Sequence, residues 1–137
     1  MGIKWSGISE DRKHEIFYTI DSKEAFIKAE KKGLKVIVPE DNQLQIDIDD
    51  ENQLAVFEER IKKLKTHNFE IKDVKIQESI SGSPHRHIYI TLEEHFTDLE
   101  RIFLQLFLGS DPVRELLSYE RIREGDEYPT LFLEKEE

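Results

Sequence analysis

The sequence predicts an α+β fold, because segments that alternate apolar and polar residues are interleaved with segments of helical periodicity. Residues 43–49 and 85–92 alternate most clearly, as half-buried strands do. Residues 51–66 place four apolar side chains on one helical face, namely Leu54, Phe57, Ile61 and Leu64. With 137 residues and no repeat or Pro/Gly-rich linker, residues 1–137 are expected to form a single domain.

The first 40 residues are expected to form a small β-α-β extension that precedes the main unit. Residues 15–20 have the pattern of a short strand. Asp21 or Ser22 is expected to cap a helix that Gly33 ends. A second strand, 34–38, follows and stops before a proline.

The main unit, residues 43–135, has the element order β-α-β-β-α-β with one additional helix before the last strand. The expected elements are strand 43–49, helix 51–66, strands 70–80 and 85–92, helices 96–108 and 112–122, and strand 131–134. This order is the split βαβ, ferredoxin-like or RRM-like, arrangement. In it, two helices cover one face of a sheet and leave the other face open. The first and third strands are central neighbours, and the last strand lies toward an edge of the same sheet.

The helix at 96–108 has the most apolar face of the chain. It is expected to bury five side chains, namely Leu99, Ile102, Phe103, Leu106 and Phe107.

Composition excludes several classes of protein. The net charge of −10 argues against a nonspecific nucleic-acid coat, which neutralises phosphates with Lys and Arg. No apolar run approaches the ~20 residues that span a bilayer, and the N-terminus lacks a signal segment, so we expect a cytoplasmic protein without a membrane partner. The sequence has no glycine-rich phosphate loop, Gly-x-Ser-x-Gly or His-Glu-x-x-His motif.

Asp47 and Asp49 are the strongest candidates for a functional site. They share the polar face of strand 43–49, where aspartate is disfavoured and where two like charges repel unless a cation lies between them. Because the chain has no cysteine, its metal ligands must be His, Asp or Glu. Hard oxygen ligands favour Mg²⁺ or Mn²⁺. The alternative is an exposed, acidic strand end without a ligand.

His85 and His87 repeat this spacing on strand 85–92, on the face that also carries Tyr89. They follow a Ser-Gly turn and are expected to lie opposite the aspartates. A neutral imidazole binds metal, and a protonated one binds a triphosphate. Glu134, on the last strand, is expected within reach of the same site as a further metal ligand. The alternative is that the two histidines share a face by chance.

Two short motifs resemble the catalytic core of the archaeo-eukaryotic primase superfamily. Ile46-Asp47-Ile48-Asp49 matches its hydrophobic-Asp-hydrophobic-Asp strand, and Ser81-Gly82 followed by His87-Ile88-Tyr89-Ile90 is similar to its Ser-Gly turn and His strand. The resemblance covers residues 43–135. It implies metal-dependent nucleotidyl transfer in which Asp47 and Asp49 bind Mg²⁺ or Mn²⁺ and His87 contacts the nucleotide phosphates. Beside these residues, we expect His85 as a further metal ligand and Arg86 and Ser81 as further nucleotide contacts.

The family carries a third acidic residue on a later element, and this chain departs from the pattern there. Ser118 stands where such proteins often have Asp, so Glu120 or Glu134 would have to substitute. The resemblance implies a nucleic-acid template, a nucleoside triphosphate and a larger replication subunit or second copy as partners. A short, degenerate relative borne by a virus or plasmid also fits.

A second resemblance uses the same histidines. Pro84-His85-Arg86-His87-Ile88 looks like the His-hydrophobic-His metal motif of HUH replication initiators and relaxases, although Arg86 is not hydrophobic. It implies that Tyr119 is a nucleophile that nicks DNA. The alternative for Tyr119 is a ring that packs on the fold with its hydroxyl in water.

A βαββαβ domain without chemistry is the third interpretation, because fold alone does not imply a reaction. The polar sheet face has few aromatic residues for RNA, so a protein-interaction module fits better. This interpretation predicts that replacing both aspartates by alanine stabilises the fold and removes no function.

Overall fold

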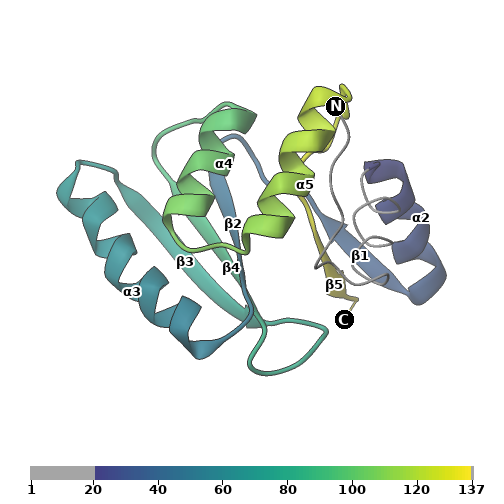
Figure 1. Ribbon diagram of the computed structural model, residues 1–137, viewed down its shortest axis with the longest axis horizontal. Helices are drawn as coiled ribbons and strands as arrows, with labels where there is room; N and C mark the ends of the chain where they lie inside the picture. The colour runs from purple at the N-terminus through teal and green to yellow at the C-terminus, as the bar shows by residue number, and fades with distance from the viewer. Residues whose placement is uncertain (1–20, 137) are drawn as a thin grey trace, which may run out of the picture.

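The computed structural model describes residues 21–136 and shows a mixed α+β fold with two small antiparallel sheets (Figure 1). Its elements are α2 (Ser22–Lys32), β1 (Leu34–Ile37), β2 (Gln43–Ile48), α3 (Glu51–Thr66), β3 (Ile71–Glu78), β4 (Arg86–Leu92), α4 (Asp98–Phe107), α5 (Pro112–Arg123) and β5 (Phe132–Lys135). The strand expected at 15–20 lies outside the described residues. Among the described helices, none is long and apolar enough to cross a membrane.

The expected order of the first three core strands is confirmed. β2, β4 and β3 form an antiparallel sheet with β4 in the centre. In its register Asp47 lies opposite His87. The first and third strands of the main unit are therefore neighbours, as the β-α-β-β order predicts.

One face of this sheet carries the hydrophobic core, which α3 and α4 cover (Figure 1). The alternate residues of β2 and β4 on this face are completely buried, namely Leu44, Ile46, Ile48, Ile88, Ile90 and Leu92. Phe57 and Leu64 of α3 and Leu104 of α4 pack against them. Because strand side chains alternate between faces, this burial turns Asp47 and His87 to the opposite face.

The last strand differs from the expectation, because β5 does not join the main sheet. It pairs with β1 in a separate two-stranded sheet, with Leu34 opposite Lys135. The N-terminal extension is thus not a separate layer, since residues 34–37 and the C-terminal strand depend on each other for backbone pairing. The three-stranded β2-β4-β3 sheet is consistent with a ferredoxin-like core, but the fourth strand of that topology is not in it.

The outer edge of β2 explains this placement. Gln43, Gln45 and Asp47 turn backbone groups away from β4, and partners from α4, α5 and their connection already occupy those groups. From α4, Arg101 Nε donates to Gln43 O (2.9 Å), and Gln105 Oε1 accepts from Gln45 N–H (2.8 Å). From α5, Arg114 donates to Gln45 O (2.7 Å). From the connection between the two helices, Ser110 Oγ accepts from Asp47 N–H (2.9 Å), and Asp111 N–H donates to Asp47 O (2.8 Å). A covered edge has no free backbone groups for another strand.

The sheet face opposite the core is also less open than expected. Phe132 of β5 stacks on His87 with ring centroids 3.7 Å apart and planes 4° apart. Phe132 and Glu134 are 5% and 2% exposed. The strand therefore turns these two side chains, rather than Leu133, toward the main sheet, and it covers part of the face that carries Tyr89.

The buried face of α4 is rotated from the expected one. Of the residues expected inside, Leu99, Phe103 and Leu106 are 54%, 69% and 42% exposed. The expected burial of Ile102 is confirmed, and Phe107 is partly buried against the core. The other inward positions are Arg101, Leu104, Gln105 and Leu108. The helix lies over the edge of β2, so polar side chains that cap this edge are buried in preference to apolar ones.

Replacing Gln105 by methionine is expected to destabilise the protein by about 1–3 kcal/mol for each buried group left unpaired. Gln105 is fully buried; it accepts from Gln45 N–H at 2.8 Å and donates to Glu115 at 2.6 Å. Urea unfolding measures the change. Leu99→Gln on the exposed side of the same helix is the control, expected within about 0.5 kcal/mol of wild type. Equal effects of the two substitutions would contradict the edge-capping role.

Candidate metal centre

Three carboxylates converge where β2 ends and α5 begins. One oxygen each from Asp47, Asp49 and Asp111 lies within 4.8 Å of the other two. All three side chains are half-buried. Carboxylate oxygens at this spacing form a suitable ligand set for Mg²⁺ or Mn²⁺.

Asp111 is the third carboxylate, and the sequence interpretation missed it. It is the N-cap of α5, and its side chain accepts from Val113 N–H at 3.1 Å. Its own N–H donates to Asp47 O at 2.8 Å, which fixes the cap beside the aspartate pair. Asp followed by Pro indicates a helix start, and this local role gives no sign of a second one at a metal site. Asp111 lies beside the aspartate pair only because the α4–α5 connection runs along the edge of β2, and this path is a tertiary feature.

The positions expected to supply the third acid lie elsewhere. Ser118 is fully buried and its hydroxyl donates to Arg114 O at 3.2 Å. Glu120 pairs with Arg123 at 3.3 Å. Glu134 is not a member of the carboxylate cluster, since its oxygens are bound by donors from β3 and β4.

Asp47 has a strongly perturbed acidity. Its pKa is raised to about 6, chiefly because burial disfavours the charged form; the Arg114 guanidinium opposes this shift, and the negative charges of Asp49, Asp111 and Glu115 add to it. The ionised form is thus poorly stabilised by the protein alone. A bound cation would supply the missing positive charge.

Each histidine faces one of the aspartates, as expected from the strand register. His85 Nδ1 lies 3.2 Å from Asp49 Oδ1, and His87 Nε2 lies 3.9 Å from Asp47 Oδ1. Burial lowers the pKa of His87, and the hydrogen bond to Glu134 partly offsets this. His87 is therefore a neutral imidazole at neutral pH.

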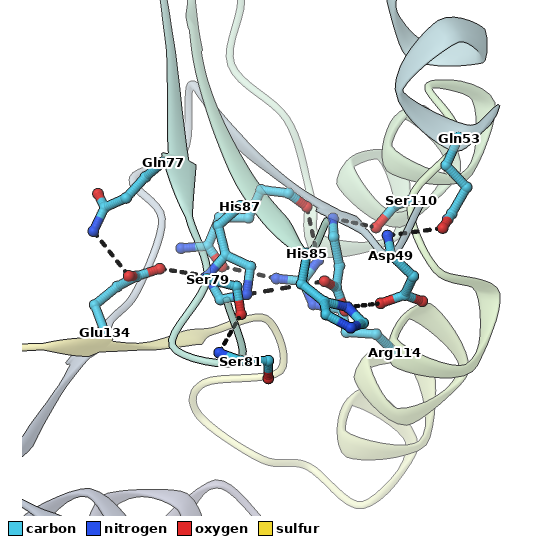
Figure 2. Close-up of polar contacts among 12 residues, drawn as sticks. Asp49, Gln53, Gln77, Ser79, Ser81, His85, His87, Ser110, Arg114 and Glu134 are labelled. Atoms are coloured by element: carbon cyan, nitrogen blue, oxygen red, sulfur yellow. Dashed lines mark hydrogen bonds and ion pairs between the residues drawn. The ribbon is translucent and has the colours of Figure 1, made fainter. Parts of the chain in front are cut away.

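Glu134 binds the other side of His87. Figure 2 shows it between Gln77 and His87, while His85 turns toward Asp49. Its carboxylate accepts from His87 Nδ1, from the Tyr89 hydroxyl at 2.6 Å and from Gln77 Nε2 at 2.9 Å. Burial and the hydrogen bond from its hydroxyl to Glu134 raise the pKa of Tyr89, so the hydroxyl keeps its proton.

A cavity of about 340 Å³ adjoins the cluster. Asp47, Asp49 and both histidines line it, together with Ser79, Ser81, Arg114 and Phe132. Its volume is within the range of small-molecule sites. The Arg114 guanidinium lies 4.3 Å from the centre of the Phe132 ring, so one wall combines a positive charge with an aromatic surface.

Two further predicted residues do not line the cavity. Arg86 pairs with Glu51 at the start of α3, at 2.9 Å, on the opposite side of β4 from His87. Tyr119 is 41% exposed on α5 and is absent from the residues that line the cavity. Ser81 does line it, and its N–H donates to Ser79 Oγ at 3.1 Å.

Comparisons of the chain with protein-family models, with curated proteins and with solved structures found no match. The assignment of a function therefore rests on the geometry of the carboxylates, the histidines and the cavity beside them.

Proposed function

We propose that this chain is a primase-like enzyme that performs metal-dependent nucleotidyl transfer with a nucleoside triphosphate and a nucleic-acid template. The observation that carries the proposal is the convergence of Asp47, Asp49 and Asp111 beside a cavity, which Asp47 and Asp49 line together with His85 and His87. The resemblance of the two strand motifs to the archaeo-eukaryotic primases supports the same chemistry. Asp111 supplies the acidic residue that the motif comparison left without a position.

The roles of the residues follow from their places. Bound Mg²⁺ or Mn²⁺ ions would align a 3′-hydroxyl with the α-phosphate and offset negative charge. The three aspartates would hold these ions, and a cation beside Asp47 would favour the ionised form of its carboxyl group. His85 and His87 line the cavity that would hold the nucleotide, and neutral His87 brings no positive charge to its phosphates. The new bond joins the 3′-oxygen to the α-phosphorus, and pyrophosphate leaves while the hydroxyl proton passes to solvent.

Template binding must overcome the net charge of −10. Metal ions at the aspartates would provide local positive charge, but a long phosphate backbone needs more contacts than one site offers. We therefore propose that the template is held together with a larger replication subunit or a second copy of this chain.

The observations favour the other interpretations less. For DNA nicking, Tyr119 would need to reach a metal shared by the two histidines. His87 Nδ1 is bound to Glu134, and His85 Nδ1 is bound to Asp49, while Tyr119 lies outside the cavity lining. A module without chemistry does not require three carboxylates to meet beside a cavity.

Primer extension on a template with Mn²⁺ and nucleoside triphosphates tests the proposal. We expect wild type to incorporate nucleotides and Asp49→Asn to lose at least about 100-fold in rate, since even residues behind metal ligands affect activity by 10–100-fold. Tyr119→Phe should retain full activity. Covalent protein–DNA adducts that Tyr119→Phe abolishes would favour nicking instead. If wild type shows neither activity, the interaction module is the remaining interpretation.

A further inference from the structure

The second sheet contributes one polar side chain to the candidate site, and it is Glu134. This carboxylate is 2% exposed. It receives three donors, from His87 and Tyr89 on β4 and from Gln77 on β3. A buried carboxylate with this many partners holds them in fixed positions, because moving any of them would remove a hydrogen bond from a buried charged group.

Of these three partners, His87 is the one whose side chain has two neutral tautomers. At pH 8, above the ordinary histidine pKa of about 6.5, a neutral imidazole carries one proton, on either Nδ1 or Nε2. The Glu134 carboxylate can only accept, so the proton that forms their hydrogen bond belongs to Nδ1. The stacked Phe132 ring, 3.7 Å away, fixes the plane of the imidazole. Nε2 then points toward Asp47 Oδ1, at 3.9 Å.

We propose that Glu134 is a positioning residue: it holds His87 in the Nδ1–H tautomer, with the Nε2 lone pair presented to Asp47 and the cavity. A carboxylate behind a histidine commonly fixes the tautomer and orientation of the ring in this way. Here that carboxylate comes from β5, so pairing of β5 with β1 and docking of this sheet complete the site. The catalytic consequence rests on the proposed function, whereas the tautomer does not.

Nitrogen-15 NMR of the histidine rings tests the tautomer directly, on the metal-free protein at pH 8. Wild type is expected to show His87 protonated at Nδ1 and unprotonated at Nε2. A wild-type ring protonated at Nε2 would overturn the proposal without any variant.

Three variants separate positioning from simple packing. Glu134→Leu removes the acceptor, and its His87 ring is expected to lose the Nδ1–H preference. Glu134→Gln keeps one acceptor oxygen and is expected to restore part of it. Tyr89→Phe removes another donor to Glu134 but keeps the His87 contact, so it should retain the wild-type tautomer. An unchanged tautomer in Glu134→Leu would overturn the proposal.

Activity and Mn²⁺ affinity form the second readout. Glu134→Leu is expected to lower the rate of nucleotide incorporation by about 10–100-fold and to leave the Mn²⁺ affinity within about threefold, because the aspartates are intact. An equal loss in Tyr89→Phe would show that packing of β5 is the cause and would overturn the positioning role. If wild type shows no incorporation, the proposed function fails, and the NMR result alone still decides the role of Glu134.

Discussion

Replacing Asp47 with asparagine is expected to stabilise the metal-free protein at pH 7.5 by up to about 3 kcal/mol, since the fold raises the pKa of this aspartate from 3.8 to about 6. The folded state favours the protonated acid, because burial and neighbouring carboxylates disfavour its charge. Asparagine keeps the shape of the side chain and removes the charge.

The sign of the pH dependence follows from the same shift. The favourable effect of protonated Asp47 is complete below the unfolded pKa of about 4 and is lost as the pH rises to about 6. The stability difference between Asp47→Asn and wild type should therefore grow between pH 4 and pH 6 and then level off. Urea unfolding at several pH values measures this difference. Asp73→Asn, at an exposed position of β3, should stay within about 0.5 kcal/mol of wild type.

Mn²⁺ is expected to stabilise wild type selectively and so to offset most of the advantage of Asp47→Asn. A ligand at 100 times its Kd stabilises by about 2.7 kcal/mol, which raises the Tm of a domain of this size by roughly 10 °C. Wild type should gain this increment, and Asp47→Asn should gain little. If both proteins gain equally, the ion binds elsewhere. If neither gains, the cluster is an acidic surface, and the stabilised variant is what an interaction module also predicts.

The residues that could be predicted from sequence are those whose neighbours are set by strand alternation. The alternation of Leu44, Ile46 and Ile48 predicts that one face of β2 is buried. The β-α-β-β order predicts that β2 and β4 are neighbours, as they are. These two facts bring Asp47 opposite His87 with no further information. The helix start at Asp50 was predictable for a similar reason, since its side chain caps Gln53 N–H at 2.8 Å within four residues.

The features that could not be predicted depend on tertiary placement. Nothing in the alternation of residues 131–134 indicates that side chains such as Gln105 and Arg114 already occupy the β2 edge. The last strand pairs with β1 instead. Glu134 consequently reaches the site from above the sheet face rather than from within the sheet, which changes its role from metal ligand to partner of His87.

The third carboxylate gives the last prediction, because Asp111 has two roles that one substitution can separate. Asp111→Asn should retain the cap of α5, since Asn and Asp cap helices about equally well. It removes one charge from the cluster of three. We expect Mn²⁺ affinity and nucleotide incorporation to fall by at least about 10–100-fold, while the Tm of the metal-free protein stays equal or rises.

Asp50 provides the matched control for this experiment. It caps α3 through Gln53 N–H just as Asp111 caps α5 through Val113 N–H, and it lies outside the group of three carboxylates. Asp50→Asn should therefore leave Mn²⁺ affinity and incorporation at wild-type values. If the two substitutions have the same effect, Asp111 acts only as a helix cap, and the metal site must be built from Asp47 and Asp49 with ligands from the substrate. A loss confined to Asp111→Asn would show that the third carboxylate of the site comes from the start of α5. This residue precedes the helix, whereas the expected positions, Glu120 and Glu134, lie within the last helix and on the last strand.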